Sequence, residues 1–125
     1  MLGTDSIIAF VATAKPAEAM PFYRDVLGLR LVEETRFALV FAAHGTMLRV
    51  TPVPDHKPLG HTVLGWKVAD IAGKVAALTA EGVAFARFPP LVQDEGGVWS
   101  SPDGNKVAWF RDPDGNLLSL TQFRT

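Results

Sequence analysis

Few side chains in this sequence could hold a metal ion. There is no cysteine, so thiolate catalysis, disulfides and zinc–sulfur sites are excluded. A divalent metal would therefore need histidine or carboxylate ligands. His44 falls in an expected turn, His56 in a proline-rich connector, and only His61 lies near a predicted strand. The carboxylates fall in turns, caps, loops, helices and strand ends, so no strand interior offers one.

Arg49 is the clearest candidate for a residue with a chemical role. It lies between Leu48 and Val50 in an apolar predicted strand, where burying its charge is costly without a partner. A carboxylate, phosphate or enolate on a bound ligand could be that partner. The alternatives are a salt bridge to Glu33 or Glu34, or an edge-strand side chain in water.

Two other polar residues offer weaker chemistry. Ser119 has no predicted His–Asp partner, so we expect a small residue that shapes a cavity and not a hydrolase nucleophile. His61 is either a solvated, hydrogen-bonded histidine or a displaced metal ligand. The glycines are scattered stops and turns, and none forms a phosphate-binding loop.

The elements that position these residues occur twice, in the order β-α-β-β-β. In the first half a helix begins at Pro16, is bent by Pro21 and ends at Gly28. In the second half a helix begins after Asp70 and ends at Gly82, about 54 residues later. The predicted strands are 7–13, 29–34, 37–42, 46–53, 62–68, 83–88, 98–100, 106–111 and 117–123.

This duplication predicts an α+β fold. Two βαβββ modules, about 1–55 and about 60–125, are expected to form one domain spanning 1–125. We expect a mainly antiparallel, strongly curved sheet around a cavity, with the helices outside.

Three segments carry a resemblance to a known family. They are FYRDVLGL at 22–29, GWKVAD at 65–70 and DPDGNLLSL at 112–120. In this order, on a duplicated βαβββ pattern, they resemble the vicinal oxygen chelate superfamily, which includes glyoxalases and bleomycin-resistance proteins. The resemblance implies a fold and a pocket but no single reaction, because the superfamily contains isomerases, lyases, extradiol dioxygenases, thiol transferases and metal-free antibiotic-binding proteins.

The resemblance also implies where metal ligands would lie. The four corresponding cavity positions are Ile8, Arg49, Val63 and Ser119, and none is a usual ligand. Side-chain alternation places a second set of residues on the same face. The cavity candidates are Arg49, His61, Lys67, Trp99, Ser119 and Thr121, and Trp99 and Trp109 are either aromatic walls or ordinary packing.

We therefore expect a metal-free small-molecule-binding protein without a cofactor, whose ligand is partly aromatic or apolar and can carry an anionic group. The alternatives are a lyase, isomerase or dioxygenase with a divergent or metal-independent site, and a structural or regulatory protein with a vestigial pocket. The net charge of −1 argues against nucleic acid and anionic membranes as partners. With no apolar run long enough to span a membrane, we expect a cytoplasmic protein. Family analogy suggests a homodimer.

Overall fold

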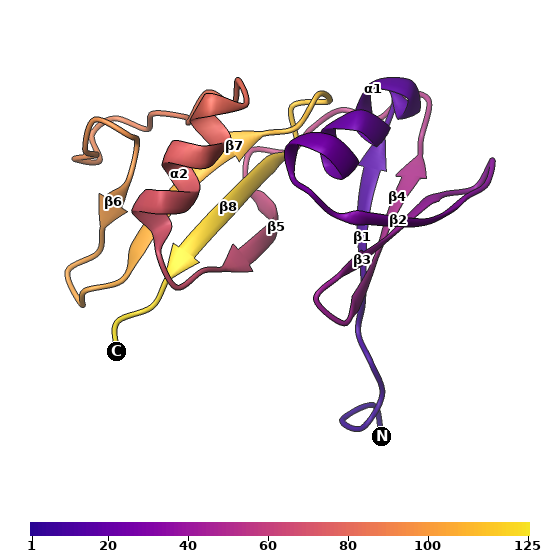
Figure 1. Ribbon diagram of the computed structural model, residues 1–125, viewed down its shortest axis with the longest axis horizontal. Coiled ribbons are helices and arrows are strands. Elements are labelled where there is room, and N and C mark those ends of the chain that lie inside the picture. Colours follow the sequence, from indigo (N-terminus) through magenta and orange to yellow (C-terminus); the bar gives the residue numbers. More distant parts are fainter. The chain divides into compact units, whose positions relative to one another are not determined.

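The computed structural model describes residues 1–125, which divide into two compact units, Met1–Lys57 and Pro58–Thr125. Each unit contains one four-stranded sheet and one helical segment (Figure 1). The predicted α+β class with two βαβββ-like modules is confirmed, and the strands form two mixed sheets, one in each unit. No helix is long and apolar enough to cross a membrane.

The sheet of the first unit has the strand order β1-β4-β3-β2. Its strands are β1 (Ile8–Thr13), β2 (Arg30–Glu34), β3 (Leu39–Ala43) and β4 (Thr46–Pro52). β1 runs parallel to β4, whereas the other two pairings are antiparallel. This arrangement places β4, which carries Arg49, in the interior of the sheet.

The helical segment of the first unit changes its winding at Pro21. α1 (Pro16–Pro21) is followed directly by a π-helical turn, η1 (Phe22–Val26), in which the Leu27 N–H donates to the Phe22 carbonyl at 2.9 Å. Proline lacks the N–H that would continue the α-helical ladder, so the chain changes its winding there instead of bending as one α-helix. Gly28, at φ 75°, ends the segment as predicted.

The second unit repeats the topology, with the strand order β5-β8-β7-β6. Its strands are β5 (Thr62–Lys67), β6 (Trp99–Ser100), β7 (Lys106–Arg111) and β8 (Leu117–Gln122). β5 is parallel to β8, and the other pairings are antiparallel. Figure 1 shows α2 (Ile71–Ala80) lying across β7 and β8. The side chain of Asp70 caps this helix by accepting from the Gly73 N–H at 3.1 Å.

The strand predicted at 83–88 does not form. This segment makes one backbone bond to the sheet, from the Ala86 N–H to the Trp109 carbonyl at 2.7 Å. The N–H of Phe88 and the carbonyl of Ala86 are bonded instead by the side chain of Gln93. Because these two backbone groups bond to a side chain and not to a strand, residues 83–88 do not pair as a strand of the sheet. β6 therefore forms the sheet edge.

Each sheet buries one face beneath its helix. In the first unit Leu48 and Val50 are fully buried, and the ring of Tyr23 lies 5.9 Å from that of Phe41. In the second unit the helix-side core is built from Trp66, Ile71, Phe85, Phe110, Leu118 and Leu120. The alternation predicted from the sequence is therefore confirmed for Leu48, Val50, Leu118 and Leu120.

Candidate ligand-binding surfaces

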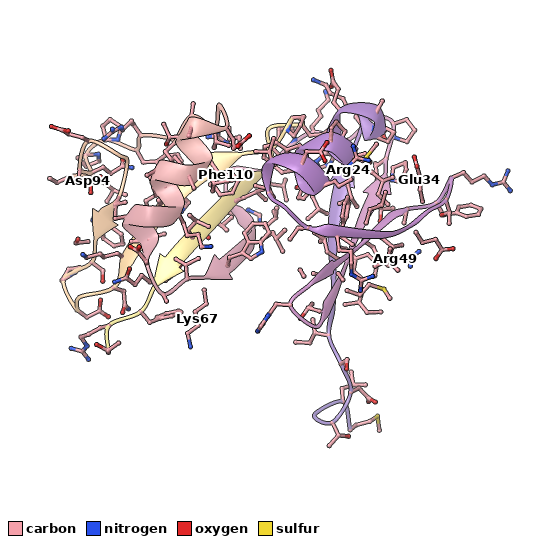
Figure 2. All side chains as sticks on the ribbon, viewed as in Figure 1. Arg24, Glu34, Arg49, Lys67, Asp94 and Phe110 are labelled. Atoms are coloured by element: carbon pink, nitrogen blue, oxygen red, sulfur yellow. The ribbon has the colours of Figure 1, made fainter.

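The other face of the second sheet brings together four of the predicted site residues. Cross-strand pairing gives two neighbouring rows, Gly65–Ser119–Trp109 and Lys67–Thr121–Val107–Trp99. Paired residues point to the same side of a sheet, so Lys67, Trp99, Ser119 and Thr121 share one side. We call this side, with Trp109, the Trp99 face. Phe110 lies on the opposite side, beneath α2 (Figure 2).

Three rings form a continuous aromatic wall on this face. The ring centroids of Trp99 and Trp109 are 6.2 Å apart with planes tilted by 33°, and Phe88 meets Trp109 edge-on at 5.4 Å. Both indoles are partly exposed. Trp99 also lines a hollow of about 560 Å³ together with residues of the 90–94 loop, Val98 and Ser100. Exposed indole surface can stack against an aromatic ligand.

Polar side chains lie on the same face of the sheet. Lys67 lies at the end of β5 (Figure 2), is exposed and forms no ion pair. Its cross-strand partner on β8 is Thr121. Ser119 is 7 % exposed, and its Oγ makes no hydrogen bond within the chain, so no base activates it as a nucleophile. A Cβ at Gly65 would lie 2.8 Å from that Oγ, so glycine leaves room for the Ser119 hydroxyl.

His61 does not join this set. It lies in an exposed bend before β5. A register shift at Val63 places Thr62, and not His61, on the side of Leu117 and Ser119. The parity argument assumed a regular strand, and the bulge breaks it. The histidine is therefore an exposed side chain at the approach to the strand.

Arg49 lies in the first unit, in the row Phe10–Arg49–Val40–Glu33. Its half-buried side chain forms no hydrogen bond and no ion pair. The salt bridges of the chain are Lys15–Glu18 and Arg24–Asp25, so the expected alternative partners, Glu33 and Glu34, do not hold it. Figure 2 shows Arg49 on its strand. Phe10, in the same row, is 62 % exposed, and Ile8 and Met47, in the next row, are 46 % and 42 % exposed. A free guanidinium among exposed apolar side chains suits an anionic group on an apolar ligand.

The four positions matched to metal ligands do not fit a metal. Ile8 and Val63 have no donor atom, Arg49 is cationic, and Ser119 offers a neutral hydroxyl. No group of three or more His, Asp or Glu side chains in the structure could hold a metal ion. These four positions therefore supply no metal-ligand set.

The carboxylates with shifted pKa values lie away from the Trp99 face and from the surface around Arg49. A hydrogen bond from Arg24 lowers the pKa of Asp25, and one from the Ser101 hydroxyl lowers that of Asp103. Both carboxylates are exposed, Asp25 in η1 and Asp103 in a turn. Neither carboxylate therefore belongs to the Trp99 face or to the row of Arg49.

Two residues of this region, Gln93 and Phe88, were missed from the sequence. The side chain of Gln93 forms hydrogen bonds with the Phe88 N–H and with the carbonyls of Ala86 and Gly97. A glutamine in an expected loop carries no pattern that distinguishes it, because its partners are backbone groups defined only by the fold. Phe88 was missed as a wall residue because it was assigned to a strand.

The chain resembles known proteins in both its sequence family and its fold. The family model of the Glyoxalase/Bleomycin resistance protein/Dioxygenase superfamily matches residues 6–120. No curated protein matches the chain. A superfamily member from Sphaerobacter thermophilus DSM 20745 is 23 % identical, with 98 % of this chain and 100 % of that chain covered and a TM-score of 0.76.

Two further solved structures belong to proteins whose roles differ from each other. TnmS3, an antibiotic-binding protein from Streptomyces sp. CB03234, is 24 % identical with 99 % of both chains covered and a TM-score of 0.76. Lactoylglutathione lyase from Agrobacterium tumefaciens is 20 % identical, with 94 % of this chain and 93 % of that chain covered and a TM-score of 0.69. These likenesses concern the fold, which hosts both binding and catalysis. The match over residues 6–120 shows that the chain belongs to the glyoxalase/bleomycin resistance protein/dioxygenase superfamily.

Proposed function

We propose that the protein binds a small, partly aromatic organic molecule on the Trp99 face without using a metal ion. The observation that carries the proposal is the partly exposed Trp99–Trp109 pair, with Thr121 and Lys67 in the same cross-strand row as Trp99. Indoles offer broad apolar surface for stacking, and an ammonium and a hydroxyl can orient a polar substituent. This combination is typical of small-molecule sites, which are mostly apolar with a few convergent polar groups.

Arg49 is a second proposed determinant of binding. Its guanidinium has no partner in the chain, so an anionic group on a ligand would be its first ionic partner. Arginine can hold a carboxylate through two parallel hydrogen bonds. This surface of the first unit is therefore proposed to bind an anion with an apolar part, such as an aromatic acid.

Binding is favoured over catalysis by the residues themselves. The metal-ligand positions are filled by side chains that do not fit a metal, and Ser119 has no activating base. A protein of similar fold binds an antibiotic, which supports sequestration as a role for such a scaffold. Conversion of a probe by the purified protein would favour the alternative, a lyase, isomerase or dioxygenase.

The test compares two tryptophans on opposite faces of one sheet. Trp99→Leu removes the ring from the proposed site, whereas Trp66→Leu removes one from the helix side. Calorimetry with a panel of two- and three-ring aromatic carboxylic acids, including 2-naphthoate, measures affinity. Stacking contributes about 0.5–1.5 kcal/mol beyond burial, so Trp99→Leu should weaken binding about two- to thirteen-fold. Trp66→Leu should leave the affinity within about twofold. Equal losses would contradict the proposal.

A further inference from the structure

One side chain in the loop between α2 and β6 uses both ends of its amide inside the loop. Gln93 Oε1 accepts from the Phe88 N–H at 2.8 Å. Its Nε2 donates to the carbonyls of Ala86 at 2.9 Å and Gly97 at 2.8 Å. A primary amide has two N–H donors, so both are engaged.

These bonds connect the backbone segments that carry the aromatic wall. Ala86 and Phe88 belong to the first part of the loop, and Gly97 lies two residues before Trp99. Ala86 is bonded in turn to the Trp109 carbonyl at 2.7 Å, and Gln93 forms a backbone bridge with Trp99. One carboxamide therefore lies at the junction of the three chain segments that place Phe88, Trp99 and Trp109.

Other side chains shape the loop without making this connection. Arg87 donates to the carbonyls of Asp94 and Glu95, and Asp94 Oδ1 accepts from the N–H groups of Gly96 and Val98. Asp94 lies at the outer end of the loop (Figure 2). Gln93 is the side chain that bonds both the 86–88 segment and Gly97.

We propose that Gln93 is a positioning residue that fixes the mutual orientation of the Trp99 and Trp109 rings and thereby the affinity for aromatic ligands. The part that concerns affinity rests on the proposed function. The part that concerns orientation does not, because it follows from hydrogen bonds within the protein. The ligand touches the indoles, and Gln93 acts through them.

Two variants remove the connection in different ways. Gln93→Leu keeps similar bulk and leaves three backbone groups without their partner. Gln93→Glu keeps the shape, but an ionised carboxylate has no N–H and faces the two carbonyls that the amide served. Asp70→Ala is the matched control, since it removes a helix cap in the same unit and lowers stability without touching the wall.

The readout is the exciton couplet that two neighbouring indoles produce in circular dichroism. Both Gln93 variants should lose more than about half of the couplet and bind 2-naphthoate about fivefold more weakly or worse. The control should keep the couplet and the affinity while unfolding at a lower denaturant concentration. An unchanged couplet in Gln93→Leu would overturn the inference, whatever happens to binding.

The two halves of the proposal fail separately. A lost couplet with unchanged 2-naphthoate affinity would support the claim that Gln93 fixes the orientation of the two rings. It would contradict the claim that the ligand contacts the aromatic wall. If the variants do not fold, the wild-type protein still decides the matter. The side-chain amide protons of Gln93 should exchange slowly with solvent in NMR, and exchange at the rate of free glutamine would overturn the inference.

Discussion

Replacing Arg49 by alanine should change ligand affinity far more than stability. The guanidinium forms no hydrogen bond or ion pair in the folded chain, so its loss leaves no protein group unpaired. Removing the half-buried stem should cost less than about 1 kcal/mol of unfolding free energy. A charge-assisted hydrogen bond contributes about 1.5–3 kcal/mol, so binding of an aromatic acid should weaken about ten- to a hundred-fold.

The assay is calorimetric titration with 2-naphthoate and its neutral analogue 2-naphthamide. Arg49→Lys should recover only part of the acid affinity, because an ammonium cannot reproduce the two parallel bonds of a guanidinium. Neither Arg49 variant should affect the amide by more than about twofold. Lys67→Ala, made in parallel, shows whether the Lys67 ammonium on the Trp99 face contributes to binding of the carboxylate. Equal losses for acid and amide would refute the reasoning, as would a large drop in stability.

Four further outcomes are expected. Gly65→Ala should destabilise the protein by about 1–3 kcal/mol in urea unfolding, and adding Ser119→Ala should relieve much of this, because the new Cβ meets the Ser119 Oγ. Phe110→Ala should cost about 3–5 kcal/mol, since the ring is fully buried, and a smaller loss would contradict its place in the core. Ser101→Ala should raise the pKa of Asp103 in an NMR titration. The lowered pKa means that Asp103 contributes stability above its unfolded value of about 3.9, and this is lost as the pH falls through the folded value. Light scattering should find a homodimer, and a monomer at micromolar concentration would contradict this.

Local patterns predicted most of the fold because they reflect local physics. Strand alternation placed Leu48 and Val50 in the core, and Gly28 marked the end of the first helical segment. The π-helical turn after Pro21 was not expected, because proline shows where an α-helix is disturbed but not how the chain continues.

The candidate site was predicted where strands are regular and missed where the backbone departs from regularity. Lys67, Ser119 and Thr121 follow strict alternation and share one face. His61 precedes the bulge at Val63, which no sequence pattern marked. The segment at 83–88 has the composition of a strand, but the side chain of Gln93 bonds the Phe88 N–H and the Ala86 carbonyl. A side chain that takes the place of a strand depends on contacts formed only in the folded loop.

Binding of an aromatic small molecule without a metal can be tested by calorimetric titration of the aromatic acid panel into metal-stripped protein, repeated after addition of Fe²⁺, Mn²⁺, Ni²⁺ or Zn²⁺. We expect stoichiometric binding by the stripped protein, with an affinity that no metal changes by more than about twofold. Binding that requires one of these metals, or release of a chemically altered probe, would contradict it.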